Sequence, residues 1–151
     1  MAGDIHQAVR DVCLWLPEAE EFVSHGSPNF RVRGKTFATY AVNHHGDGRV
    51  ALWLNALPGS QELHVRADPE HFFVPPYVGP RGWLGVVLNR GIAWKRVAAL
   101  VREAYEKVAP SDLRACIGNT PVLMAPRKTL SASEIDPLKS ARAVALLKPF
   151  R

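Results

Sequence analysis

The chain has 151 residues, of which 47% are hydrophobic and 22% are charged, and its formal net charge is +5. This composition is close to average usage and predicts one globular domain whose core needs no metal or cross-link. No apolar run reaches the roughly 20 residues that cross a bilayer, and the N-terminus, MAGDIHQAVR, lacks the basic and apolar regions of a signal peptide. We therefore expect a cytoplasmic protein with two buried thiols, Cys13 and Cys116, rather than a disulfide.

The positive charge is unevenly distributed along the chain. Residues 1–116 carry 13 Lys and Arg against 12 Asp and Glu, whereas residues 117–151 carry 6 against 2. The first part lacks the strong basic field of tight duplex-binding proteins, although a local basic patch is compatible with a neutral total. We predict a folded domain over residues 1–117 and a basic C-terminal extension, partly helical or flexible, over residues 118–151.

The first predicted elements are one helix and a series of short strands. Asp4 is a suitable N-cap for a helix over residues 5–16, whose apolar residues recur at helical spacing and which Pro17 ends. Runs of β-prone residues at 21–25, 29–33, 35–43 and 49–57 are separated by segments with turn chemistry. These runs predict an antiparallel meander, which the apolar stripe of the helix covers.

The second half combines short helices with a strand-turn-strand unit over residues 70–94 that leads into a long helix. We predict short helices at 59–67 and around His71, a turn at 79–82, a strand at 83–88, and helices at 93–108 and 111–117. In the longest helix, Glu103 and Lys107 are spaced for an exposed i,i+4 ion pair. Strands grouped between terminal helices predict an α+β fold, with an antiparallel sheet covered on one face by the N- and C-terminal helices.

Several short motifs resemble those of a known family. The run FRVRGKTFA over residues 30–38, followed by Tyr77, Arg81, Trp83 and the pair Ala104-Tyr105, resembles the MmcQ/YjbR family of small bacterial proteins. The likeness covers about residues 4–116. It implies a compact α+β domain similar in outline to the frataxin-like CyaY fold, described as a double wing and proposed to bind DNA. It brings no established reaction and no catalytic residues.

The cations around position 33 are the candidate nucleic-acid site. In the simplest register an extended strand places Arg31, Arg33 and Lys35 on one side, where they can contact phosphates with salt-dependent affinity. If Arg81 and Trp83 lie beside them, Arg81 adds forked phosphate contacts and Trp83 a stacking face for an unpaired base. We thus predict a monomer that binds DNA weakly through these five residues. Two alternatives stay open. The cations could simply keep an exposed sheet edge solvated, which prevents it from pairing with another chain, and Trp83 could belong to the core.

A second hypothesis is a small-molecule-binding or scaffold domain without catalysis. Its pocket would be lined by aromatic residues and a histidine: His71, Phe73, Tyr77 and Trp94. The same residues are equally suited to a hydrophobic core. A metal site or an enzyme has less support, because the adjacent His44 and His45 lack metal-ligand spacing and no hydrolase or phosphate-loop motif is present. We therefore expect no cofactor, no metal, no catalytic residue and no membrane partner.

Overall fold

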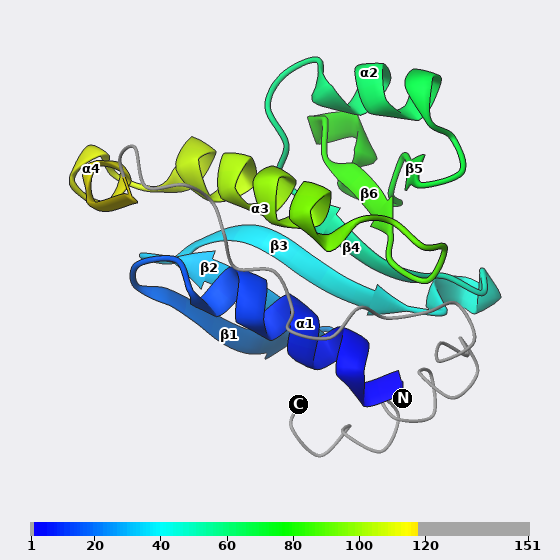
Figure 1. Ribbon diagram of the computed structural model, residues 1–151, viewed down its shortest axis with the longest axis horizontal. Coiled ribbons are helices and arrows are strands. Elements are labelled where there is room, and N and C mark those ends of the chain that lie inside the picture. Colours follow the sequence, from blue (N-terminus) through cyan, green and yellow to red (C-terminus); the bar gives the residue numbers. More distant parts are fainter. Residues whose placement is uncertain (1, 118–151) are drawn as a thin grey trace.

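The computed structural model describes residues 2–117, which form four helices and a six-stranded antiparallel sheet (Figure 1). The strands lie in the order β1-β2-β3-β4-β6-β5. Their bounds are β1 Ala19–Ser24, β2 Ser27–Val32, β3 Lys35–Val42, β4 Val50–Leu54, β5 Phe72–Phe73 and β6 Leu84–Val87. The helices are α1 Ala2–Leu14, α2 Ser60–Ala67, α3 Trp94–Val108 and α4 Ser111–Ile117, with single 3-10 turns η1 His44–Gly46 and η2 Gly79–Arg81. The predicted extension at 118–151 lies outside the described residues.

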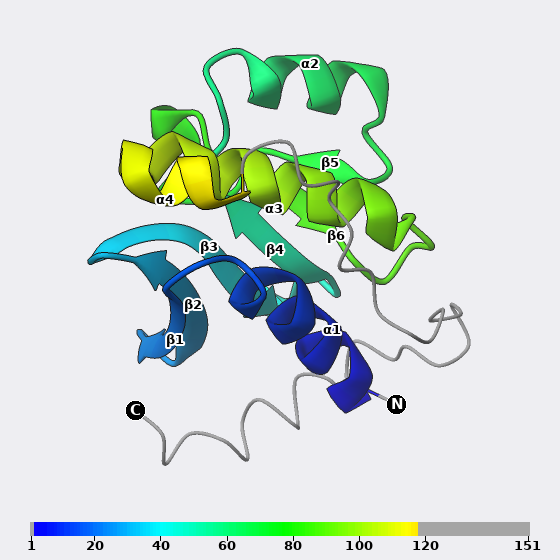
Figure 2. The same cartoon turned by 60° about the vertical axis from the view of Figure 1, so that its left-hand side comes forward.

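The main core lies between the sheet and two helices. α1 and α3 lie on the same face of the sheet (Figures 1 and 2). Ile5 and Val9 of α1 pack with Phe30, Leu52 and Tyr105, and all five are 0% exposed. These residues recur at helical spacing in the helices and on one face of the strands, so the pattern that predicted the elements also builds the core. The predicted α+β fold, with terminal helices over one face, is confirmed.

A smaller core lies on the opposite face of the sheet. Ala41, Ala51 and Val87 are paired across β3, β4 and β6, one position beyond residues that face the helices, so their side chains point the other way. The cluster consists of Ala41, Ala51, Trp53, Phe73, Trp83 and Val87, and Val78 packs against it. The segment between β5 and β6 therefore covers part of this second face.

A half-buried ion cluster fixes α1 to the edge strand β1. Glu21 accepts a hydrogen bond from Nε of Arg10 at 2.7 Å and contacts Nε2 of His6 at 3.0 Å. Burial alone would raise the pKa of Glu21, but the hydrogen bonds from His6 and Arg10 outweigh burial and lower this pKa. The cluster therefore stabilises the docking of α1 on the strand that it covers.

Two local helix predictions are wrong. α1 begins at Ala2, so Asp4 lies in its first turn and not at an N-cap. No helix forms around His71, because the next two residues pair with β6 as the short strand β5. Asp68 lies at the C-terminal end of α2, and its carboxylate contacts Nδ1 of His71 at 2.9 Å.

The two cysteines have different surroundings. Cys13 is buried in the main core, as predicted, and this burial raises the pKa of its thiol. Cys116 is exposed, contrary to prediction, because α4 buries only Leu113 and Ile117. Within residues 2–117, none of the helices has the length and apolarity needed to cross a membrane.

Candidate functional site

The hairpin between β2 and β3 turns over two residues, Arg33 and Gly34. Both have positive φ, 47° and 80°, and Val32 pairs with Lys35 across the turn. Positive φ at both central residues is the pattern of a type I′ turn, whose twist matches that of the flanking strands. The predicted row of Arg31, Arg33 and Lys35 along one extended strand is therefore wrong, because the chain reverses direction at Arg33.

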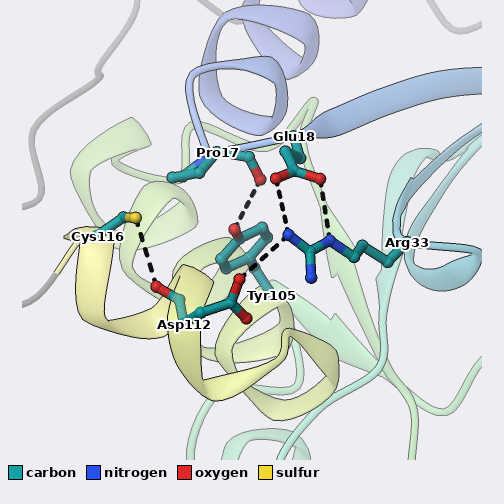
Figure 3. Close-up of polar contacts among 6 residues, drawn as sticks. All are labelled: Pro17, Glu18, Arg33, Tyr105, Asp112 and Cys116. Carbon is teal, nitrogen blue, oxygen red and sulfur yellow. Dashed lines mark hydrogen bonds and ion pairs between the residues drawn. The ribbon is translucent and has the colours of Figure 1, made fainter.

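Arg33 joins three segments of the chain at the end of this hairpin (Figure 3). Its Nε and Nη2 donate to the two carboxylate oxygens of Glu18 at 3.0 and 2.9 Å. The same Nη2 donates to Oδ2 of Asp112 in α4 at 3.2 Å. The bond from Arg33 is the main reason why the pKa of Glu18 is lowered. Because all three side chains are exposed, the pairs add little stability, and their main effect is to position α4 beside the hairpin.

A buried tyrosine, Tyr105, makes a further contact beside these ion pairs. The hydroxyl of Tyr105 donates to the carbonyl oxygen of Pro17 at 2.7 Å (Figure 3), and its ring meets that of Phe37 edge-on at 5.6 Å. Burial raises the pKa of Tyr105 to about 12, so the hydroxyl stays protonated and keeps donating. This bond attaches the C-terminal half of α3 to the loop that carries Glu18.

A pocket of about 480 Å³ opens beside the Arg33 junction. Its lining comes from the β2–β3 hairpin and from the corner between α3 and α4: Arg33, Lys35, Lys107, Val108, Ala109, Pro110, Ser111 and Arg114. Half of these residues are cations, and none carries a carboxylate. We call this the basic pocket. Such a concave surface attracts anions, because the low-dielectric wall focuses the field of the converging charges.

The cations of the basic pocket differ in how their charge is compensated. Of these four cations, only Arg33 forms ion pairs with carboxylates of residues 2–117. Lys107 donates from Nζ to Oδ1 of Asn55 at 2.7 Å and to the carbonyl oxygen of Ala56 at 3.0 Å, which are neutral acceptors. Arg114 donates to the backbone oxygen of Glu106 at 3.4 Å. The ammonium group of Lys35 has no hydrogen-bond or ion-pair partner within residues 2–117.

Three residues of the predicted nucleic-acid site lie outside the basic pocket. Arg31 donates to Oε1 of Glu20 at 2.7 Å, and its guanidinium lies 4.3 Å from the ring centre of Phe22. Arg81 is exposed at the end of η2. Trp83 is 7% exposed and belongs to the second core, so its indole presents no stacking face. The lining of the basic pocket thus includes Arg33 and Lys35 but not the other three predicted residues.

The residues of the predicted aromatic pocket do not meet either. Trp94 belongs to the main core and Phe73 to the second core, on opposite faces of the sheet. His71 is bonded to Asp68 and to the backbone oxygen of Arg90. Burial alone would lower the pKa of His71, but these bonds outweigh it and raise this pKa. Tyr77 is 71% exposed.

The histidine turn η1 lies against the same exposed tyrosine. Nε2 of His45 is 2.7 Å from the hydroxyl oxygen of Tyr77, and both residues have positive φ, 52° and 66°. The ring of His44 meets that of Trp53 edge-on at 5.1 Å, and burial lowers the pKa of His44. Across the described part of the chain, no three His, Cys, Asp or Glu side chains are grouped to hold a metal.

Two cations of the basic pocket were missed by the sequence reasoning. Lys107 was assigned to an exposed pair with Glu103, but it turns instead toward Asn55 and Ala56 at the end of β4. Arg114 had no assigned role. The available signal was weak: both residues flank Pro110, which ends one helix and precedes the next. The packing of the whole domain decides which side of the α3–α4 junction faces the hairpin, and sequence periodicity does not report this packing.

Comparison with known proteins supports the resemblance found in the sequence. The family model described as YjbR matches residues 14–107. The chain belongs to the YjbR family. The crystal structure of Deinococcus radiodurans protein DR2400, with the family-model domain DUF419, matches with a TM-score of 0.60 at 18% identity, covering 83% of this chain and 94% of that one. At this identity the likeness shows the fold. No curated protein matches.

The YjbR match includes three of the four cations of the basic pocket, but only three of its eight lining residues. Arg33, Lys35 and Lys107 lie within the matched residues 14–107, and Lys107 is the last of them. Ser111 and Arg114 come from α4, beyond the match. In this member of the YjbR family, α4 therefore adds one wall of the pocket to the part of the chain that the family model covers.

Proposed function

We propose that this YjbR-family domain binds nucleic acid weakly, through phosphate contacts in the basic pocket. The observation that supports the proposal is the convergence of four cations from the hairpin, α3 and α4 on one pocket whose lining carries no carboxylate. Lys and Arg side chains bind phosphate through charge-assisted hydrogen bonds, and each phosphate contact releases condensed counterions.

The arrangement favours modest affinity. Arg33 is already paired with two carboxylates, which leaves Lys35, Lys107 and Arg114 to supply most of the attraction. Three phosphate contacts predict a slope of log K against log salt of about −2 for a single strand and about −3 for a duplex. The protein should therefore bind at low salt and release much of its ligand near physiological salt.

The test is fluorescence anisotropy of labelled single- and double-stranded DNA, with the full chain, over a salt series. We expect saturable binding, and Lys35→Gln and Lys107→Gln should each make the salt slope shallower by about 0.7–0.9. Arg66→Gln is the matched control, because it removes one exposed charge from α2, away from the pocket. No saturable binding by the full chain at low salt would refute the proposal.

The same experiment examines the cations that the sequence singled out elsewhere. Arg31→Gln and Arg81→Gln remove charges outside the basic pocket, so we expect smaller effects from them than from Lys35→Gln. If these two variants lose most of the binding and the pocket variants lose none, the interface lies where the sequence reasoning first located it, and our assignment of the pocket is wrong.

A small anionic ligand is the second candidate function. The specific observation in its favour is the pocket volume of about 480 Å³, which falls in the range of roughly 300–1,000 Å³ common for small-molecule sites. A rise in melting temperature with a phosphorylated metabolite, lost in Lys107→Gln and absent with DNA, would favour this function over nucleic-acid binding.

A further inference from the structure

The basic pocket gathers its cations around one volume and does not spread them in a row. Lys35 lines it from the hairpin, and Lys107 and Arg114 line it from the α3–α4 corner. A continuous strand presents phosphates at regular intervals, and proteins that follow its backbone line a groove with cations. Converging cations instead suit a ligand that concentrates its negative charge on one group.

The hydrogen-bond donors left free in the pocket match a group with several oxygens. A Lys ammonium has three N–H donors and an Arg guanidinium has five. Lys107 already uses donors on Asn55 and Ala56, and Arg114 donates to the Glu106 carbonyl. These neutral acceptors orient both side chains, and no carboxylate of residues 2–117 pairs with either charge. Little further ordering of the side chains is therefore needed when an anion binds.

Arg33 has a positioning role in this arrangement. Its bonds to Glu18 and Asp112 compensate its charge and link α4 to the hairpin. Arg114 lies two residues after Asp112 in the same short helix, so the Arg33–Asp112 bond also sets where the Arg114 guanidinium lies. The Ser111 hydroxyl lines the same wall and can donate a further hydrogen bond.

We propose that the basic pocket binds the terminal phosphomonoester of a nucleic-acid strand in preference to an internal phosphodiester. This inference rests on the function proposed above. A terminal phosphate carries about −1.5 to −2 charge near pH 7 and has three acceptor oxygens, whereas a phosphodiester carries a single charge. The extra charge and oxygen meet the free donors of Lys35 and Arg114. A strand end also enters a concave site from one direction, while the middle of a strand must enter and leave.

The test compares two oligonucleotides of the same sequence, labelled at the 3′ end and carrying either a 5′-phosphate or a 5′-hydroxyl. With the full chain at low salt, we expect the phosphorylated strand to bind about tenfold more tightly, as one added charge-assisted contact would allow. Arg114→Gln should abolish this preference, whereas the control Arg66→Gln should keep it. Equal melting temperatures of the two variants would show that both remain folded.

The outcomes separate this inference from the function on which it rests. Equal binding of the two strands would overturn the end preference but leave nucleic-acid binding standing. A preference that survives Arg114→Gln would overturn the assignment to the basic pocket. Failure of both strands to bind would overturn the proposed function and the inference together. Displacement of the phosphorylated strand by an equal concentration of a nucleoside 5′-monophosphate would overturn the assignment to a strand end.

Discussion

Replacing Gly85 by alanine tests how tightly the second core is packed. A Cβ at this position of β6 would lie 2.5, 2.6 and 2.7 Å from three atoms of the Phe73 ring, which would have to withdraw by about 0.9 Å to reach an ordinary contact of 3.4 Å. The ring is 9% exposed, and the guanidinium of Arg49 lies 4.0 Å from its centre, so it has little room to move. We therefore expect Gly85→Ala to disturb the packing of Phe73 in the second core and to destabilise the protein.

The expected magnitude follows from two opposing terms. Overpacking a well-packed core costs about 1–3 kcal/mol, and replacing glycine recovers roughly 0.5–1 kcal/mol by restricting the unfolded chain. The net loss of unfolding free energy is thus about 0.5–2 kcal/mol, measurable by urea denaturation as a lower midpoint at an unchanged m value. Phe73→Leu in the same chain should reduce the cost of Gly85→Ala, because the two residues are in contact.

Gly79 provides the matched control for this prediction. A Cβ there would meet one atom, Cγ1 of Val74 at 2.6 Å, and Val74 is 54% exposed, so its methyl group can turn toward solvent. We expect Gly79→Ala to be close to neutral. Equal midpoints for Gly85→Ala and Gly79→Ala, or an unchanged cost in the Phe73→Leu background, would refute the claim that the Phe73 ring is held rigidly.

Two further stability predictions concern polar contacts around the main core. Tyr105→Phe should lower the unfolding free energy by about 1–2 kcal/mol, because the Pro17 carbonyl loses its donor; an unchanged melting temperature would contradict this. Glu21→Gln should cost about 1 kcal/mol near pH 7, whereas the exposed control Glu20→Gln should cost little. Because folding lowers the pKa of Glu21, its contribution is present above the unfolded value of about 4.3 and is lost as pH falls through the folded pKa. The melting temperatures of Glu21→Gln and the natural chain should therefore converge in acid, and a constant difference would disprove the linkage.

The elements that could be predicted from the sequence are those in which local pattern and burial agree. The helical spacing of Val97, Val101 and Tyr105 predicted α3, and all three lie in the main core. The alternation of the strands predicted the meander for the same reason. A strand-turn-strand unit was predicted over residues 70–94, but the bounds of its first strand, β5, were not, because two residues carry no period and the strand forms by pairing with β6.

The candidate site was harder to predict because its parts are distant in the chain. Gly34 marked a break between two strands, but one glycine does not show that Arg33 shares the turn with positive φ. Once the chain reverses there, Arg31 and Lys35 belong to different strands, and their sequence spacing no longer reports their side of the sheet. Lys107 and Arg114 reach the hairpin only because α3 crosses the sheet, which no local signal records.

The short helix α4 also determines where the rest of the chain begins. It ends three residues after Arg114, and the 34 residues that follow carry 6 Lys and Arg against 2 Asp and Glu. These cations are covalently attached to the helix that carries Arg114. A salt slope of the full chain that is steeper than the value of about −2 to −3 expected from the pocket cations would therefore report phosphate contacts made by this segment as well.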